Sequence, residues 1–224
     1  MKPFIVILTG PTCAGKSTLE AKLRETGFAS VVSTTTRPPR VGEVDGKNYH
    51  FVNETRFSAL QEEGGMVESV TFGGYRYGVT KGEIDRHASA GAPVVVVCEP
   101  SGRNQIVNFC EQNGWAYHTV YVGNPDRVIA GRFLSRMLND VEEVGLFPSL
   151  ADPVVERYAQ RMEQMVTTER AWVAEAYFQN QDGSRNEPYD RILWEFNEEN
   201  DTAVVQSILD EFRVFKFERE RLVA

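Results

Sequence analysis

The chain has 224 residues, 42% of them hydrophobic, and a formal net charge of −8. This length supports one sizeable core, and the acidic balance argues against general binding to nucleic acid or anionic membranes, which requires spare cations. No apolar run approaches the roughly 20 residues of a membrane-spanning helix. The three scattered cysteines favour a reducing compartment over a disulfide framework. We therefore expect a cytoplasmic protein without a secretory leader.

Short apolar runs rich in β-branched residues alternate with helical stretches along the chain. Continuous apolar runs are typical of strands buried on both faces, and strand–helix alternation favours crossover connections. The fold class predicted from this pattern is α/β, with a parallel sheet. Strands are predicted at 4–8, 30–32, 94–98, 117–122 and 192–196. Helices are predicted at about 16–26 and 102–113, after Pro125 to about Asn139, and following a cap at Asn200 or Asp201.

Two regions interrupt the alternation. Residues 33–90 are rich in Thr, Arg, Gly and Tyr, and predict an inserted lobe of short strands with one helix at about 54–64. Residues 139–190 are helical and charged, and end in a loop tip at 181–188. We expect one domain over 1–224, with its core at about 1–32, 91–130 and 189–224, a lobe at 33–90, and a lid with an extended helical insert at 131–188.

The segment GPTCAGKS (10–17) has the pattern G-x-x-x-x-G-K-[ST] between a predicted strand and a predicted helix, the setting of a phosphate-binding loop. Backbone N–H groups at a helix N-terminus carry partial positive charge, and glycines allow phosphates to approach closely. Lys16 would reach the β- and γ-phosphates of a nucleoside triphosphate, and the Ser17 hydroxyl would bind Mg²⁺. The loop alone does not separate a kinase from a GTPase, a motor or a sensor. The residues predicted to bind the triphosphate are Gly10, Thr12, Cys13, Ala14, Gly15, Lys16, Ser17 and Thr18.

A second motif, STTTRPPRVGEVDGKNYHF (33–51), indicates a site for another phosphate. Two prolines separate Arg37 from Arg40 and stiffen the backbone, so both guanidinium groups keep a fixed spacing. Such a pair suits a phosphate dianion, which accepts bidentate hydrogen bonds from arginine. Tyr49 and Tyr77 supply neutral donors. The alternative, that the arginines are solvated loop residues, weakens beside a phosphate loop.

Together these segments resemble the guanylate kinase family. The resemblance rests on GPTCAGKST (10–18), STTTRPPRVGEVDGKNYHFV (33–52), Glu68, FGGYRYG (72–78) and Gly102, covers most of residues 4–165, and is weaker over YDRILWEF (189–196). It implies a P-loop NTPase-type three-layer fold with a parallel-sheet core, a monophosphate-binding lobe and a helical lid. It also implies a Mg²⁺-dependent phosphotransferase of nucleotide metabolism, with ATP as donor and GMP or dGMP as acceptor.

The resemblance also implies roles for matching residues of the lobe. The acceptor phosphate would be held by Arg37, Arg40, Tyr49 and Tyr77, and the base would be contacted by Ser33 and Glu68. A carboxylate accepts from both N1–H and the 2-amino group of guanine. Adenine lacks this donor pair, so a buried Glu68 would stay unpaired against it.

The lid is implied by two arginine-bearing segments, RFLSRM (132–137) and VVERYAQRM (154–162). Their arginines would close over the bridging phosphates and neutralise the transferring phosphoryl group. The residues predicted to act in catalysis are Lys16, Arg132, Arg136 and Arg157, with Arg157 the preferred lid residue.

The chain departs from the family pattern at the base pocket. Val79 stands where the family has a small hydroxyl residue, with Thr80 next, and Glu99 supplies one of the two carboxylates that the family places after its third core strand. Val79 and Glu99 stay in the predicted substrate site. A further departure is an extra stretch near 167–188. The alternative acceptor is therefore a modified or non-guanine (deoxy)nucleoside monophosphate, or another small phosphate.

A non-catalytic binding module is a third hypothesis, which intact Lys16 and Ser17 disfavour. The expected ligands are ATP and a nucleoside monophosphate, with no nucleic acid and no membrane. The C-terminal stretch 208–224 predicts a packed amphipathic helix. A homodimer contact through that helix is the alternative.

Overall fold

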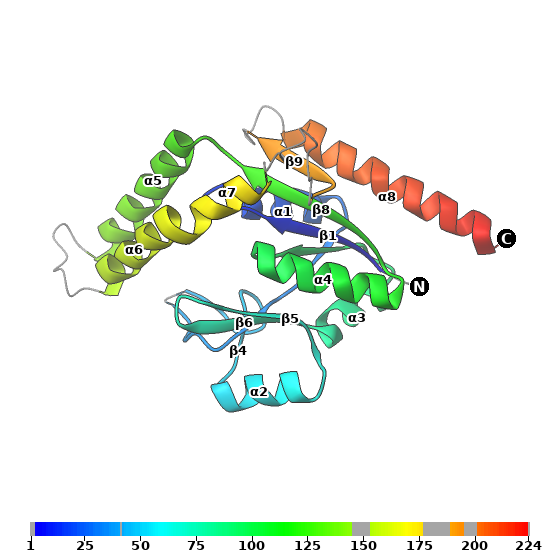
Figure 1. The fold of residues 1–224 in the computed structure, drawn as a ribbon, viewed down its shortest axis with the longest axis horizontal. Helices are drawn as coiled ribbons and strands as arrows, with labels where there is room; N and C mark the ends of the chain where they lie inside the picture. The colour runs from blue at the N-terminus through cyan, green and yellow to red at the C-terminus, as the bar shows by residue number, and fades with distance from the viewer. Residues whose placement is uncertain (1–2, 41, 145–152, 177–188, 195–200, 224) are drawn as a thin grey trace. The chain divides into compact units, whose positions relative to one another are not determined.

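The computed structural model describes residues 3–40, 42–144, 153–176, 189–194 and 201–223. The chain separates into two compact units. Figure 1 draws the chain as a ribbon and labels its helices and several of its strands. Unit 1 comprises residues 1–9, 17–119 and 199–224, and unit 2 comprises residues 10–16 and 120–198.

Unit 1 contains a parallel sheet in which β7 (Val94–Val97) pairs with β1 (Phe4–Thr9) on one side and β2 (Ala29–Ser30) on the other. Every residue of β1 is buried, which explains the unbroken apolar run in the sequence. The strands predicted at 4–8 and 94–98 are confirmed. The strand predicted at 30–32 is displaced toward Ala29.

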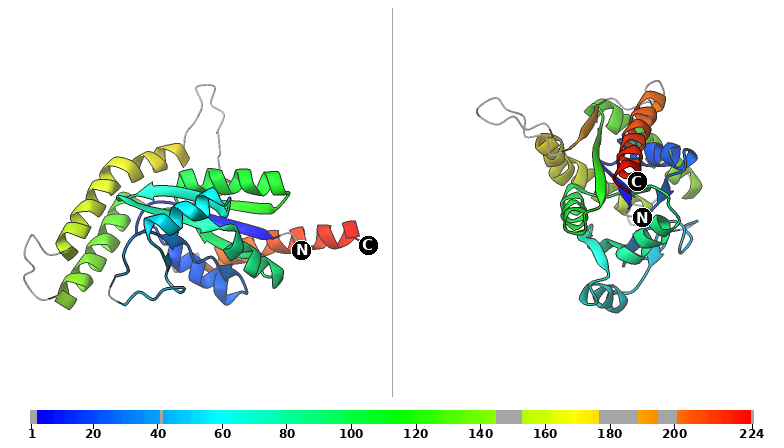
Figure 2. Two further views of the ribbon diagram at one scale, coloured as in Figure 1. Left: turned by 90° about the horizontal axis from the view of Figure 1, so that it is seen from below. Right: turned by 90° about the vertical axis from the view of Figure 1, so that its right-hand side faces the viewer.

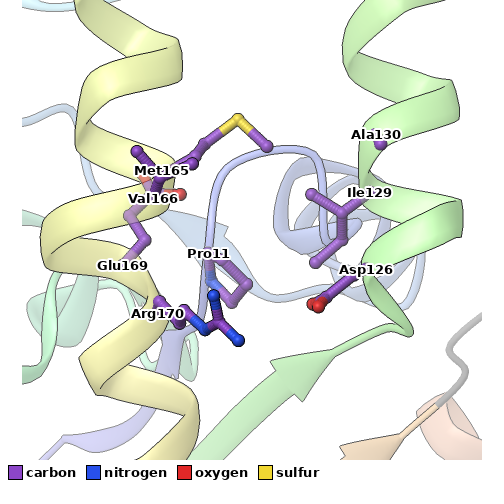
Figure 3. Close-up of a pocket in the computed structure, with 8 residues that line it drawn as sticks. All are labelled: Pro11, Asp126, Ile129, Ala130, Met165, Val166, Glu169 and Arg170. Carbon is purple, nitrogen blue, oxygen red and sulfur yellow. The ribbon is translucent and has the colours of Figure 1, made fainter.

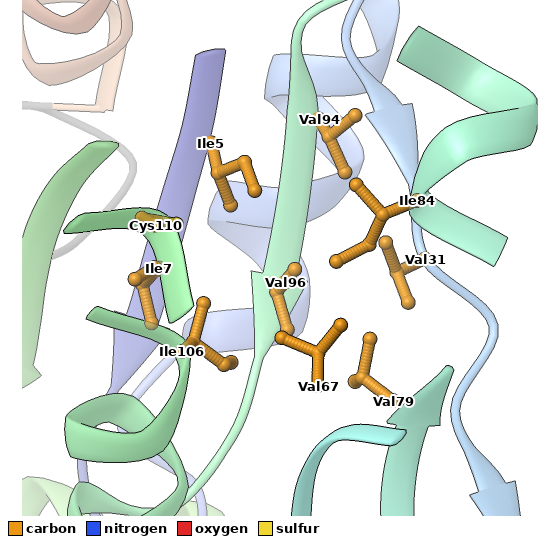
Figure 4. Packing of buried hydrophobic residues seen from close by; sticks show 10 residues of the cluster. All are labelled: Ile5, Ile7, Val31, Val67, Val79, Ile84, Val94, Val96, Ile106 and Cys110. Carbon is orange, nitrogen blue, oxygen red and sulfur yellow. The ribbon is translucent and has the colours of Figure 1, made fainter. Parts of the chain in front are cut away.

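The helices of unit 1 are α1 (Lys16–Glu25), α3 (Lys81–Ser89), α4 (Pro100–Asn113) and α8 (Asp201–Val223). A core cluster gathers strand residues such as Ile7 and Val96 with Ile84 of α3 and Ile106 of α4 (Figure 4). The ring of Phe212 on α8 lies 5.4 Å from that of Phe4 and 5.8 Å from that of Phe28, so α8 packs through an apolar face.

A second, four-stranded sheet of unit 1 has the order β4-β3-β6-β5. Its strands fall within residues 33–90, where the sequence predicts short strands. Its elements are β3 (Thr34–Thr35), β4 (His50–Phe51), β5 (Met66–Phe72) and β6 (Tyr75–Thr80), and α2 (Glu54–Glu62) connects β4 to β5. The β5–β6 register shifts between Met66 and Glu68, a bulge that re-aims the side chains next to it.

In unit 2, β8 (Ala116–Gly123) pairs in parallel with β9 (Arg191–Trp194) from Val120 onward. The helices are α5 (Asp126–Val144), α6 (Pro153–Gln164), the π-helix η1 (Met165–Glu169) and α7 (Arg170–Ala176). Helices α5 and α6 lie side by side in Figures 1 and 2 and contact each other, with the rings of Phe133 and Tyr158 5.3 Å apart.

In this unit one predicted helix is longer in the structure, and other predicted segments lie outside the described residues. The helix predicted to end near Asn139 continues to Val144. The predicted loop tip at 181–188, most of the insert at 167–188, and the end of the strand at 192–196 lie outside the described residues. Within the described ranges, no helix is long and apolar enough to cross a membrane.

Candidate functional site

The loop from Gly10 to Lys16 has a backbone that the sequence pattern requires. Gly10 has φ +138°, and a Cβ on it would lie 2.0 Å from the carbonyl oxygen of Val122 on β8, so no side chain fits there. Gly15 has φ +108°, and Cys13 adopts φ +61°, which is uncommon for a residue other than glycine. The loop is therefore a tightly specified turn packed against the end of β8.

The ammonium group of Lys16 folds back onto its own loop. It donates to the carbonyl oxygens of Gly10 at 2.7 Å and Pro11 at 2.8 Å. Two of the three donors of the ammonium group are thus used to orient it.

The side chains of Asn124, which follows β8, and of Arg132 on α5 donate to two further carbonyls of the loop. The Asn124 amide donates to the carbonyl of Ala14 at 2.7 Å, and the Arg132 guanidinium donates to the carbonyls of Cys13 and Ala14, each at 3.3 Å. Because donors occupy these carbonyls, their partial negative charge is offset, which favours an anion at the loop.

Two arginines, Arg136 of α5 and Arg161 of α6, lie close enough to Cys13 to lower the pKa of its thiol, although burial raises that pKa overall. Burial lowers the pKa of Arg161, and the like charge of Arg136 lowers it further. Among the described residues, neither guanidinium has a carboxylate within ion-pair distance. Cations gathered without a counter-ion are costly, so this cluster suits a polyanion. Arg161 was not among the candidates derived from sequence.

Arg157 has a different environment from Arg161. Its guanidinium donates to the Asp140 carboxylate at 2.6 Å, and the Tyr158 hydroxyl donates to the same oxygen at 2.6 Å. This cluster ties α6 to α5. Its predicted catalytic role stays a prediction.

Ser17 and Thr18 at the start of α1 are exposed. The described residues contain no group of three or more His, Cys, Asp or Glu side chains that could hold a metal ion. Mg²⁺ commonly binds through nucleotide phosphates and few protein ligands, so a lone Ser17 hydroxyl fits this ion.

A cavity of about 570 Å³ opens beside Pro11, between α5 and η1 (Figure 3). Its walls are largely apolar, and Asp126 and Arg170 supply opposite charges. The lining residues are Pro11, Asp126, Ile129, Ala130, Met165, Val166, Glu169 and Arg170.

In the lobe of unit 1, Arg37 is buried and already engaged. One of its guanidinium nitrogens lies 2.9 Å from both carboxylate oxygens of Glu43, and the other donates to the Pro38 carbonyl at 2.7 Å. Burial alone would raise the pKa of Glu43, but hydrogen bonds from the Arg40 amide and from Arg37 lower it below its usual range. Glu43 thus holds both segments of the arginine pair in register.

Aromatic rings surround this arginine. The Arg37 guanidinium lies 5.4 Å from the ring centroid of Tyr49, and the Tyr49 and Tyr77 rings are 6.0 Å apart. Burial raises the pKa of Tyr49, and Tyr77 raises it further, so its hydroxyl stays a neutral donor. Ser33, at the start of this lobe, accepts the His50 backbone N–H through its carbonyl at 2.9 Å. The structure therefore brings together Ser33, Arg37, Arg40, Tyr49 and Tyr77 in one lobe.

Glu68, on β5 beside the bulge, is the least satisfied acidic group of this lobe. It is 4% exposed, and its Oε2 has no hydrogen-bond partner among the residues that the structure describes. Burial, together with the charge of Glu99, raises the pKa of the Glu68 carboxyl from its usual 4.5 to about 8. A Cβ on Gly102 would lie 3.1 Å from this Oε2, so the glycine leaves room at the carboxyl. A buried unpaired acceptor of this kind is typical of a ligand site.

The two positions that depart from the family pattern have distinct settings. Val79 is fully buried in the core cluster (Figure 4). The neighbouring Thr80 hydroxyl accepts the Glu83 N–H at 3.2 Å and caps α3. Glu99 is the N-cap residue of α4, and its charge helps to raise the pKa of Glu68.

The parallel sheet and the glycine-rich loop that enters α1 define a P-loop α/β nucleotide-binding protein. The family model for guanylate kinase matches residues 2–140, more than half of the chain. The chain therefore belongs to the guanylate kinase family.

Individual relatives agree with this assignment. A guanylate kinase of Parasynechococcus marenigrum is 38% identical over 104 residues, which cover 46% of this chain and 57% of that protein. One of Bifidobacterium longum is 40% identical over 105 residues, covering 46% and 54%. The matched segment thus spans about half the length of these relatives. The solved guanylate kinase of Anaplasma phagocytophilum shares the fold, with a TM-score of 0.54 and 20% identity over 95% of this chain and 86% of that one.

Proposed function

We propose that this chain transfers the γ-phosphoryl group of ATP to a guanine-type nucleoside monophosphate, GMP or dGMP, with Mg²⁺. The observation that carries the proposal is Glu68, a buried carboxyl. One of its oxygens has no partner among the described residues, and the same lobe contains arginine and tyrosine donors. A soluble cytoplasmic enzyme with a lobe at 33–90 and a lid at 131–188 belongs to the same proposal.

Base selection would follow from hydrogen-bond counting at Glu68. An ionised carboxylate accepts from N1–H and from the 2-amino group of guanine, so both oxygens find donors. Adenine presents an acceptor at N1, and the buried carboxylate would then stay unpaired. Leaving a charged buried group unpaired costs about 1–3 kcal/mol or more. Ser33 supplies the second base contact in this proposal.

The acceptor phosphate would bind between Arg37, Arg40, Tyr49 and Tyr77. Glu43 holds Arg37 in place beforehand, so little side-chain entropy is lost when the phosphate arrives. The acceptor is already an anion, so the reaction needs no general base with an unusual pKa.

The donor phosphates would bind the loop amides and Lys16. Mg²⁺, held by the Ser17 hydroxyl and the phosphates of ATP, supplies further charge neutralisation. Arg132 and Arg136, together with the newly identified Arg161, offset the charge that develops on the transferring group. Positioning and electrostatics of this kind supply most of the rate in phosphoryl transfer.

One observation favours a second acceptor class. At neutral pH a Glu68 with a pKa of about 8 is largely protonated, and a carboxylic acid donates to an unprotonated N1. Such a group matches a 6-aminopurine, including a 2-aminoadenine deoxynucleotide. The choice depends on whether the bound base draws the proton off Glu68.

A turnover assay with Mg·ATP tests both acceptor proposals. Its panel of monophosphates is GMP, dGMP, AMP, dAMP, dTMP, dCMP and a 2-aminoadenine deoxynucleotide. Strong turnover of GMP or dGMP alone supports the first proposal. Turnover of the 6-aminopurines without GMP supports the second. Equal rates for all members, or none for any, would overturn both.

A further inference from the structure

Glu169 is a buried carboxylate that the roles above do not use. It is 3% exposed and lies at the end of η1, facing the phosphate loop within unit 2. Its two oxygens accept from the Thr12 backbone N–H at 2.8 Å and from the Thr12 hydroxyl at 2.7 Å. An anion placed beside a loop that binds anions is unfavourable by charge alone, so its position calls for a separate reason.

The π-helical turn explains how Glu169 reaches the loop. Glu169 follows Arg161 by eight residues, which in a regular α-helix leaves the two side chains about 80° apart around the axis. The extra residue of a π-turn makes the separation equivalent to seven, or about 20°. Both residues consequently face the same way, and both act on the pKa of Cys13. Figure 3 shows Glu169 on this turn, with Pro11 of the loop nearby.

The contact with Thr12 reaches Lys16 through a single peptide group. The Thr12 N–H donates to Glu169, and the carbonyl of the same peptide unit, that of Pro11, accepts from the Lys16 ammonium at 2.8 Å. A trans peptide is planar, with its N–H and C=O pointing in opposite directions. Fixing the N–H therefore fixes the direction of the Pro11 carbonyl, one of the two that accept from the ammonium.

We propose that Glu169 is a positioning residue: it fixes the Pro11–Thr12 peptide plane, and that plane sets where the Lys16 ammonium rests for the donor phosphates. The inference rests on the proposed function of the loop in binding ATP. The contribution of Glu169 to binding of the donor phosphates is geometric, since the carboxylate acts through an acceptor oxygen and not through its charge.

The test uses the full chain with Glu169→Ala, Glu169→Gln and Glu169→Met, and with Glu163→Ala, an exposed carboxylate on the preceding helix, as the matched control. Glutamine keeps an acceptor oxygen for the Thr12 N–H, whereas methionine keeps the length without an acceptor. We expect Glu169→Ala and Glu169→Met to weaken binding of Mg·AMP-PNP in calorimetry and to lower kcat about tenfold or more, with KM for the acceptor unchanged. Glu169→Gln stays within about threefold of the parent.

A double-mutant cycle tests the route through lysine. In a Lys16→Met background, Glu169→Met causes no further loss of AMP-PNP affinity if Glu169 acts through Lys16. Additive losses would overturn the inference, as would parent-like affinity in Glu169→Met or a Glu169→Gln as weak as Glu169→Met. Should Glu169→Met unfold, a Glu169→Gln variant with parent-like melting but a defect of more than about tenfold in affinity still overturns it.

The cycle is read from ATP-analogue binding, so it also separates this inference from the proposed function. A parent chain that binds AMP-PNP but phosphorylates no monophosphate contradicts the proposed function and leaves the cycle to decide on Glu169. A parent chain that binds no ATP analogue contradicts both.

Discussion

Two regions of the molecule each bury a carboxyl group, and they treat it in opposite ways. In the lobe of unit 1, Glu68 is 4% exposed, and within the described part of the chain its Oε2 has no hydrogen-bond partner. Beside the phosphate loop of unit 2, Glu169 is 3% exposed and both of its oxygens accept hydrogen bonds from Thr12. The two carboxyl groups are about equally buried, but they differ in whether their oxygens accept hydrogen bonds.

The difference separates recognition from preorganisation. An unpaired buried acceptor is costly in the empty protein, and a ligand with matching donors removes that cost, so the group discriminates between ligands. A fully paired acceptor gains nothing from a ligand but holds its partner in one geometry. The following predictions test this division, from the largest effect to the smallest.

Lys16→Ala removes the cation that the loop orients. We expect kcat for the accepted monophosphate to fall about 10³-fold, because the charge on the transferring group loses its nearest fixed counter-charge. Binding of GMP alone, measured by calorimetry without ATP, should stay near the parent value, since the lobe is untouched. An equal loss of GMP binding would show that the loop and the lobe do not have separate roles in binding. Parent-like turnover would favour neither enzyme hypothesis.

Arg161→Ala and Arg157→Ala compare two arginines one helical turn apart on α6. We expect Arg161→Ala to lower kcat about 100-fold, because its guanidinium lies beside the loop without a carboxylate partner among the described residues. Arg157→Ala should lower the melting temperature and change kcat only about threefold, because its guanidinium is paired with Asp140. Steady-state kinetics and thermal unfolding measure both. The reverse order would show that Arg157 leaves Asp140 during turnover.

These arginines also show what sequence can and cannot predict. The strand–helix alternation follows from local patterns, and most of the predicted strands and helices lie close to where the structure has them. Arg157 pairs with Asp140 of α5, a contact that no local pattern contains, so sequence alone could not distinguish its surroundings from those of Arg161. Arg161 could have been found from its four-residue spacing after Arg157, which places both on one helical face.

Other features of the site also depend on contacts between distant parts of the chain, so the sequence did not predict them. Glu43 lies inside the arginine motif, but its capture of Arg37 depends on how the loop folds back. Glu169 is 157 residues from Thr12, and a π-turn that the sequence does not announce aims it at the loop. Val79 belongs to the candidate base site by alignment of motifs, whereas the structure places it in the core. Its role in the base site stays a prediction.

Glu68→Gln tests recognition directly. An amide presents one acceptor and one donor where guanine requires two acceptors, so we expect the affinity for GMP to fall about tenfold to fiftyfold. Affinity for AMP should change about threefold or less, or rise, because the amide matches the adenine edge. Calorimetric titration with both nucleotides gives the ratio. An unchanged ratio would remove Glu68 from base recognition and leave its burial unexplained.

The smallest effect is a dependence on pH. The pKa of Glu68 is about 8, and guanine binds the ionised form, so GMP affinity should rise about tenfold between about pH 7 and about pH 9 and then level off. The same raised pKa stabilises the empty fold below the usual value of 4.5, and this stabilisation is lost as the pH rises through about 8.

The nucleotide phosphate also titrates, so the matched control is Glu99→Gln, which removes the charge that helps to raise the pKa of Glu68. In this variant the pH at which GMP affinity levels off should move down. In Glu68→Gln the base-specific rise, taken relative to AMP, should disappear. Proton release on GMP binding, from calorimetry in buffers of different ionisation enthalpy, measures the same linkage. A parent chain that releases no proton near neutral pH would show that Glu68 is already ionised before the base binds. In that case burial would not raise the pKa of Glu68 as expected.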